Sequence, residues 1–230
     1  MMHRSQIIGG VIFGLLLTMP VLLPLIGEGY LTGLIIKAML LAIAAISLDL
    51  LIGHGGMVSL GHSAFVGVGA YATAISLESG IENILLLLTI TLIVTGLVAF
   101  VTGILALRTS GIYFLMITLA FGQMIYFTLT SLAAYGGDDG LTLWSLATLF
   151  GSNIVQNGEG LYFVVLGTLF ITWWGVHRIS RSRFGRVLRA ARDNPERAEV
   201  LGYSVTHYRL AAYLIAAMIA GVSGLLLVQH

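Results

Sequence analysis

The stretch RISRSRFGRVLRAARDNPERAEVLGYSVTHYR, residues 178–209, is the one strongly polar part of a very apolar chain. Apolar runs flank it on both sides, and it carries eight of the eleven Lys and Arg residues: Arg178, Arg181, Arg183, Arg186, Arg189, Arg192, Arg197 and Arg209. Because Lys and Arg near the ends of membrane spans resist translocation, a basic loop between two spans belongs on the cytoplasmic side. We therefore expect residues 178–206 to form a cytoplasmic loop, and this expectation determines the orientation of the other spans.

The composition is that of a membrane protein. Hydrophobic residues make up 58% of the 230 residues and charged residues only 9%, whereas a soluble domain carries about 25% charged residues. The chain has no cysteine, which excludes disulfides, thiolate metal sites and a cysteine nucleophile. Its only basic run lies between two apolar spans, so we expect no binding to nucleic acid.

The apolar runs predict an all-α integral membrane protein, a single transmembrane domain over residues 1–230 with about seven membrane-spanning helices. The expected spans are residues 7–26, 31–52 (or starting at 34), 53–77, 84–107, 111–132, 161–177 and 207–228. Two runs allow another interpretation: the first also fits a signal peptide, and the third is rich enough in glycine to form a re-entrant loop. Residues 141–150 are too short to cross and would be re-entrant or lie at the membrane surface.

Seven spans give a consistent orientation with the N-terminus in the cytoplasm. Arg4, Arg108 and the basic loop then share the cytoplasmic side, while the acidic loops around Glu78 and Asp138 lie outside. The apolar helical pattern continues to the last residues of the chain. We therefore expect further chain to follow them.

The basic loop contains the signals of a short, well-defined helix. Asn194 suits the N-cap, Pro195 the first helical position, Glu196 the positive end of the helix dipole, and Gly202 the C′ position. These signals predict a helix over residues 195–201, preceded by a basic helix over residues 184–192. Such a helix fits a groove on a soluble partner, but an amphipathic segment lying on anionic lipid is an equal alternative.

The glycine-rich run contains two series of small residues at helical spacing. Ser59, Ser63 and Gly67 recur four residues apart, as do Gly61, Phe65 and Gly69. Small residues at this spacing allow close helix packing in a bilayer, and we expect this role for most of them. Glycines at 53, 55 and 56 predict an unwound start, which a membrane tolerates only inside protein or beside a cavity.

Asp49 and His62 are the ionisable residues expected within the membrane, so each is a candidate for contact with a transported species. Asp49 lies near the inner end of its span and would alternatively pair with His54. His62 would alternatively be a neutral histidine that forms a hydrogen bond between helices.

The outer loop contains two adjacent acids, Asp138 and Asp139, in the sequence GGDDG. A solvated turn is the simpler interpretation, and a metal site or a surface for a basic partner is the alternative. The chain has no Gly-x-x-x-x-Gly-Lys-Ser/Thr sequence, so we do not expect it to hydrolyse ATP. No residue spacing indicates a catalytic triad or a metal centre, and we expect no cofactor in this chain.

Three stretches resemble the permease subunits of branched-chain amino acid ABC importers, the M-type subunit in particular. The first is SLDLLIGHGGMVSLGHSAFVGVGAY, residues 47–71; the second comprises LRTSGIY (107–113), TLAFG (118–122) and GGDDGLT (136–142); the third is SRFGRVLRAARDN (182–194) with Ala198 and Gly202. The resemblance covers residues 45–228. Members of this family usually continue for several further spans, and we expect these C-terminal spans to be missing from residues 1–230.

The resemblance implies a bacterial or archaeal plasma-membrane assembly of two permease chains, two cytoplasmic ATPase subunits that hold ATP and Mg²⁺, and an extracytoplasmic binding protein. It favours docking of the basic loop on an ATPase subunit, with a coupling role for Arg186, Arg189, Asp193, Asn194, Glu196, Ala198 and Gly202. From their residue types and spacing, we assign Asp49, Ser59, Gly61, His62, Ser63 and Gly67 to the substrate path or to its helix packing. Asp138 and Asp139 are candidates for docking the binding protein.

Leucine, isoleucine and valine are the substrates that the resemblance implies, and urea or short amides are the nearest alternative. A channel or ion-coupled carrier using Asp49 and His62 is an alternative of another class, and would transport without any ATPase. A membrane adaptor that transports nothing is the third alternative.

Overall fold

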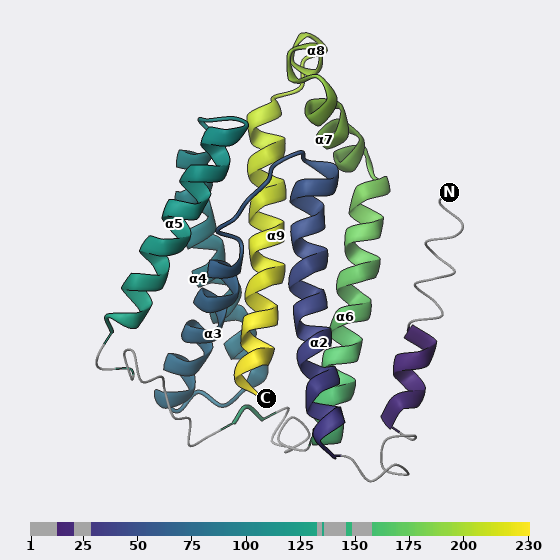
Figure 1. The fold of residues 1–230 in the computed structure, drawn as a ribbon, viewed down its shortest axis with the longest axis vertical. Helices are drawn as coiled ribbons and strands as arrows, with labels where there is room; N and C mark the ends of the chain where they lie inside the picture. Colours follow the sequence, from purple (N-terminus) through teal and green to yellow (C-terminus); the bar gives the residue numbers. More distant parts are fainter. Residues whose placement is uncertain (1–12, 21–28, 133–134, 136–145, 149–157) are drawn as a thin grey trace.

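The computed structural model describes residues 13–20, 29–132, 135, 146–148 and 158–230. Every named element is a helix: α2 (Gly29–Asp49), η1 (Leu50–His54, a π-helical turn), α3 (Ser63–Glu78), α4 (Ile84–Ala106), α5 (Ile112–Thr130), α6 (Gly158–Arg181), α7 (Arg183–Asp193), α8 (Pro195–Val200) and α9 (Val205–Val228). The long helices lie side by side, and α7 and α8 project beyond one end of the bundle (Figure 1). The expected all-α bundle is confirmed.

Within the described ranges, five segments are long and apolar enough to cross a membrane: Leu31–His54, Ile84–Ala106, Ile112–Thr130, Gly158–Arg181 and Val205–Val228. They correspond to five of the seven expected spans. The third expected span forms α3, which has only 16 residues and follows an unwound segment, residues 55–62. Of the first expected span, the structure describes only residues 13–20, which are helical.

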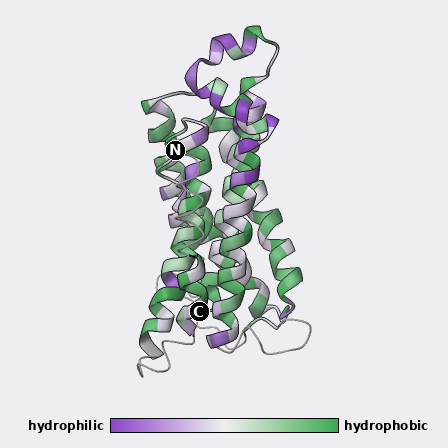
Figure 2. Ribbon diagram, turned by 90° about the vertical axis from the view of Figure 1, so that its right-hand side faces the viewer, coloured by the Kyte–Doolittle hydropathy of each residue, from purple (hydrophilic) through white to green (hydrophobic). Residues whose placement is uncertain are grey.

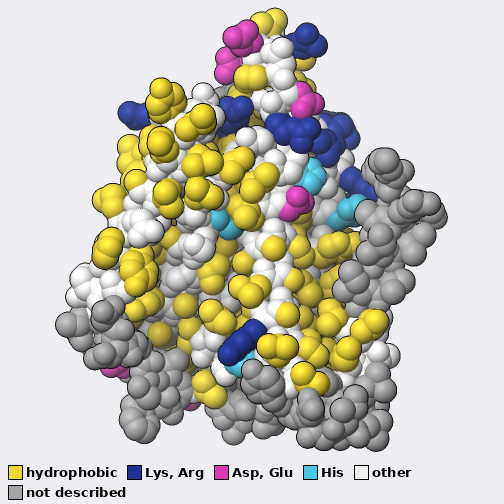
Figure 3. Space-filling model, viewed as in Figure 1, with side chains coloured by type: hydrophobic (Ala, Val, Ile, Leu, Met, Phe, Trp, Pro, Cys, Tyr) yellow, Lys and Arg dark blue, Asp and Glu magenta, His cyan; other side chains and the backbone are white. Residues whose placement is uncertain are grey.

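The two ends of the bundle differ in charge. One end, which we call the basic end, carries Arg108 and the arginine-rich helix α7, and polar residues and Lys/Arg side chains gather there (Figures 2 and 3). The opposite, acidic end carries Glu78, Glu82 and Glu159. Asp138 and Asp139 lie outside the described residues.

Helix α9 is the centre of the bundle, packed against α2, α3 and α4. In its most apolar stretch 56% of the residues are buried, against 11% for the peripheral helix α5. Small residues permit this packing, since a methyl group added to Gly69 would overlap the carbonyl of Gly221 and one added to Gly224 would overlap the carbonyl of Val66. Close contact of this kind replaces the hydrophobic effect as the source of helix association in a bilayer.

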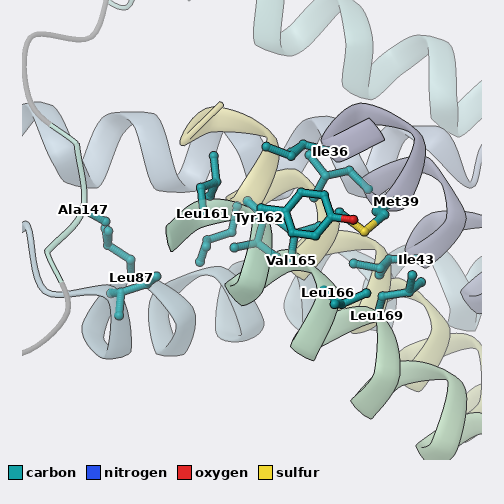
Figure 4. Packing of buried hydrophobic residues seen from close by; sticks show 14 of the residues in the cluster. Ile36, Met39, Ile43, Leu87, Ala147, Leu161, Tyr162, Val165, Leu166 and Leu169 are labelled. Carbon is teal, nitrogen blue, oxygen red and sulfur yellow. The ribbon is translucent and has the colours of Figure 1, made fainter. Parts of the chain in front are cut away.

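Two apolar clusters fill the bundle. Near the acidic end, the ring of Tyr162 packs among Ile36, Met39 and Val165 (Figure 4). Its hydroxyl donates to the Leu16 carbonyl at 2.6 Å and so attaches the helix at residues 13–20 to α6. The second cluster surrounds Phe65 and Tyr213, whose rings meet edge to face with centroids 5.5 Å apart.

Residues 146–148 pack across the acidic end. The Ala147 N–H donates to Oε1 of Gln229 at 2.8 Å, and Thr148 pairs with Asn83 beside the start of α4. This part of the short apolar run thus lies at an end of the bundle, which agrees with the surface alternative; the flanking residues 141–145 and 149–150 lie outside the described ranges.

Candidate functional site

The unwound segment, residues 55–62, separates η1 from α3 and passes between α2 and α5. At its start the helix widens, because the Met57 and Gly55 N–H groups both bond to the Leu51 carbonyl. Gly56 follows with φ of 66°, a left-handed conformation in which glycine avoids the cost of a side chain. The unwound start predicted from the glycines is confirmed.

One face of the unwound segment is buried against α2. His62 is 4% exposed, and its Nε2 lies 2.7 Å from Oγ of Ser47. The Ser47 hydroxyl donates to the Ala44 carbonyl at 2.7 Å, so its oxygen is the acceptor toward His62. The alternative that His62 forms a hydrogen bond between helices is therefore confirmed. Ser59 is equally buried, and neither its hydroxyl nor Nδ1 of His62 has a hydrogen-bond partner among the described residues.

The other face of the unwound segment contacts α5. The Leu60 N–H donates to Oγ1 of Thr118 at 3.3 Å. The unwound segment and α5 approach so closely at Gly61 that a methyl group there would overlap the Thr118 carbonyl. The sequence SLGH of the first family stretch thus lies against TLAFG of the second. Their spacing in the sequence does not predict this contact.

Beside this contact lies a hollow of about 220 Å³, lined by residues of α3 and α5. Gly61, Ser63 and Gly67, three of the predicted path residues, line it together with Gln123 and Tyr126. Ser63 is exposed to it, whereas Ser59 and His62 are buried. The sequence interpretation missed Gln123 and Tyr126, although Gln123 is a polar residue inside the apolar run 111–132.

Asp49 does not join His62. Its side chain is 64% exposed and Oδ2 lies 3.9 Å from Nδ1 of His54. The alternative that Asp49 pairs with His54 is confirmed. The two ionisable residues therefore occupy different environments, one at the surface and one buried.

The predicted short helix of the basic loop is confirmed as α8, with both of its caps. Oδ1 of Asn194 accepts the Arg197 N–H at 2.9 Å, and Gly202 has φ of 86°. The Gly202 N–H donates to the Glu199 carbonyl at 2.8 Å and the Tyr203 N–H to the Ala198 carbonyl at 3.2 Å, the paired bonds of a Schellman motif.

The side chains of α8 divide into two sets. Ala198 is buried with Ala191 and Val205 in a small apolar cluster that joins α7, α8 and α9. Val200 and Leu201, by contrast, are 88% and 70% exposed, and Glu196 is exposed beside them. Among the predicted coupling residues, Ala198 therefore holds the helix in place and Glu196 faces outward.

The basic helix α7 begins at residue 183 and its N-cap Ser182 accepts the Gly185 N–H. Arg186 is exposed and donates to the Arg181 carbonyl at 3.3 Å. Asp193 is 67% exposed and accepts from Nε of Arg192 at 3.1 Å. Arg189, the remaining predicted coupling residue of this helix, is half-buried.

Arg192 connects α7 to the start of the unwound segment. Its guanidinium donates to the Gly53 carbonyl at 2.5 Å, and its side-chain carbons fill the space beside Gly56. On the other side, Arg209 of α9 donates to the Ala191 carbonyl at 3.1 Å. Arg192 was not among the predicted site residues, because nothing in the sequence distinguishes it from the other seven arginines of residues 178–209.

These features define a polytopic helical membrane protein with a capped, partner-accessible loop at its basic end and a broken helix inside the bundle. The family model described as "Branched-chain amino acid transport system / permease component" matches residues 30–230. The chain therefore belongs to this family of ABC transporter permeases, and it is a multi-pass membrane protein. The resemblance inferred from the three sequence stretches is confirmed.

Two curated relatives are similar to the chain. Both are the high-affinity branched-chain amino acid transport system permease protein LivM, one from Salmonella typhimurium and one from Escherichia coli; each is 26% identical, over 82% of this chain and 50% of the relative. The chain spans about half the length of these curated relatives. No solved structure matches it.

Proposed function

We propose that the chain is a permease subunit of an ATP-driven importer that moves leucine, isoleucine and valine across the bacterial or archaeal inner membrane. Membership of the permease family supports this proposal, as does the LivM similarity. In this proposal the basic end faces the cytoplasm, the chain has seven spans, and the N-terminus is cytoplasmic. ATP and Mg²⁺ are bound by two ATPase subunits, and a second permease chain completes the path.

Helix α8 is the surface we propose for docking on an ATPase subunit. It is the part of the described chain that projects farthest from the bundle at the basic end (Figure 1). Its exposed Val200 and Leu201 offer apolar contacts, and Glu196 and Arg197 surround them with charge. An apolar centre with a polar rim is the usual composition of a protein interface.

The single observation that carries the coupling proposal is the bond from Arg192 to the Gly53 carbonyl. A displacement of α8 moves α7, because the Ala191, Ala198 and Val205 cluster joins them. Arg192 then passes that movement to the unwound segment, whose other face contacts α5. Coupling between distant sites requires a chain of physical contacts of this kind.

The hollow between α3 and α5 is the part of the path that we propose for the substrate. Ser63, Gln123 and Tyr126 supply hydroxyl and amide groups that can bond to a carboxylate and an ammonium, and the surrounding glycines and leucines leave room for an aliphatic side chain. On the acidic side, Asp138 and Asp139 are the carboxylates proposed to dock the binding protein.

Uptake by the complete transporter in proteoliposomes tests the proposal. Labelled leucine should accumulate only with the ATPase subunits, ATP and the binding protein present, and unlabelled valine but not urea should compete. Competition by urea would assign the amide class, and uptake without ATPase subunits would assign a carrier. Either result would contradict the proposed function.

A further inference from the structure

A second hollow lies on the outside of the bundle, where α6 ends at the basic end. It has a volume of about 480 Å³ and is lined by Trp173, Trp174, His177, Arg178, Arg181 and Ser182. It is separate from the hollow between α3 and α5 and from α8. None of the proposed steps of transport uses it.

The aromatic wall of this hollow is held in place. Trp173 packs against Phe13 with ring centroids 5.7 Å apart, and it stacks on His177 at 5.8 Å with an interplanar angle of 9°. Trp174 remains 56% exposed. Indole rings at the end of a membrane span lie at the level of the lipid headgroups, because one edge is polar and the rest is apolar.

The two guanidinium groups of the hollow lack an acidic partner in the described part of the chain. Arg178 and Arg181 are exposed, and the ion pairs found among the described residues are His54–Asp49 and Arg192–Asp193. Arg186 lies beside Arg181 through its bond to the Arg181 carbonyl. The hollow is therefore positively charged at one edge and apolar below it.

We propose that this hollow binds the headgroup of an anionic phospholipid. Two guanidinium groups match the geometry of a phosphate, which they bind with several N–H groups each, and the Ser182 hydroxyl adds a further donor. The exposed face of Trp174 contacts the glycerol region and the start of an acyl chain. Basic pockets at the ends of membrane helices recognise anionic lipids through this combination.

The position of the arginines favours a lipid over a protein partner. Arg181 is the last residue of a helix long and apolar enough to span the membrane, and Trp173 and Trp174 lie within that helix. Arginines and tryptophans at the end of a membrane span are expected at the level of the lipid headgroups, whereas the proposed ATPase contacts lie farther out on α8. Lipid binding at this hollow is independent of the direction and substrate of transport.

Native mass spectrometry of the complete detergent-purified transporter, titrated with phosphatidylglycerol or phosphatidylcholine, tests the proposal. We expect preferential binding of phosphatidylglycerol, and the R178Q/R181Q double variant should bind it about 30-fold more weakly, at about 1 kcal/mol for each arginine. The R178K/R181K variant, which keeps both charges, should recover part of this loss. Arg108→Gln is the matched control, since Arg108 is exposed at the same end but outside the hollow.

Three results would overturn the proposal. The first is equal phosphatidylglycerol affinity for R178Q/R181Q and the wild type. The second is complete displacement by excess inorganic phosphate, which would assign the hollow to a free anion. The third is loss of the ATPase subunits from R178Q/R181Q, which would assign the arginines to a subunit interface. If R178Q/R181Q fails to fold or to insert into the membrane, Trp174→Leu provides the same test, and unchanged lipid affinity there would also contradict the proposal.

Discussion

At the scale of single residues, Arg192 joins two parts of the chain that lie 139 positions apart in the sequence. The bond runs from a charged donor to a carbonyl at the point where the helix opens. Bonds to charged groups contribute about 1.5–3 kcal/mol each. Its loss would detach α7 from the unwound segment without disturbing the spans themselves.

Arg192→Gln should therefore reduce ATP-dependent leucine uptake by at least about tenfold, which corresponds to about 1.4 kcal/mol of coupling. The ATPase subunits should still co-purify and hydrolyse ATP, because α8 is unchanged. Parallel assays of uptake and ATP hydrolysis measure this separation. Arg108→Gln, which removes a charge at the same end, should behave as the wild type; normal uptake by the Arg192 variant would contradict the coupling route.

Gly61 and Gly67 provide a matched pair for testing the contact with α5. A side chain at Gly61 meets the Thr118 backbone, whereas the nearest atom to a methyl group on Gly67 is Cδ1 of Leu129 at 3.8 Å. Gly61→Ala should abolish uptake and lower the free energy of unfolding by about 1–3 kcal/mol, as overpacking does. Gly67→Ala should be tolerated in a detergent melting assay, and equal melting temperatures would show that the contact at Gly61 is not tight.

The sequence predicted local features of the site better than its contacts. Asn194, Pro195 and Gly202 were recognised because capping depends on neighbours within a few residues. Arg192, Gln123 and Tyr126 were missed because their roles arise from contacts between separate helices. Composition also did not show that Ala198 would face inward while Glu196 faces outward.

At the scale of elements, α8 is a short helix whose shape depends on its caps. Six residues cannot form a stable helix alone. The Schellman motif at Gly202 and the cap at Asn194 provide the missing hydrogen bonds. The proposed docking on an ATPase subunit therefore requires this backbone geometry as well as the exposed side chains.

Substitutions at Gly202 should have graded effects. Gly202→Ala keeps the N–H bond to Glu199 and costs about 1–2 kcal/mol for a left-handed φ, so uptake should fall moderately. Gly202→Pro removes that N–H and requires φ near −65°, so coupled uptake should be abolished while membrane insertion remains normal. Joint truncation of Arg189 and Glu196 should have the same phenotype. Gly175→Ala in α6, where a methyl group meets nothing within 4 Å, is the control; normal uptake by Gly202→Pro would refute the coupling role.

At the scale of the whole molecule, hydropathy predicted five of the spans closely, because about 20 apolar residues are a strong signal. The glycine-rich run was harder to interpret, since its 16-residue helix and unwound start take their positions from packing against α2, α4, α5 and α9. The central position of α9 was not predicted. The role of its small residues in packing depends on the glycines and carbonyls that face them in the folded protein.

The absence of cysteine from the chain allows a direct test of orientation. Ser110→Cys at the basic end and Glu82→Cys at the acidic end place single thiols at exposed positions. In intact cells a membrane-impermeant maleimide should label Glu82→Cys alone, and after lysis it should label both. Labelling of Ser110→Cys in intact cells would place the basic end outside and contradict the proposed orientation.

The sparse packing of α5 determines how much free energy its movement requires. Only Phe114 and Thr118 of this helix are buried, and in a bilayer an apolar side chain that leaves protein enters lipid, with little hydrophobic penalty. Withdrawal of α5 thus costs chiefly the Leu60 to Thr118 hydrogen bond, the packing of Phe114 on Tyr213 and some van der Waals contact at Gly61. One wall of the hollow between α3 and α5 therefore needs little free energy to move, whereas α9 is packed against α2, α3 and α4.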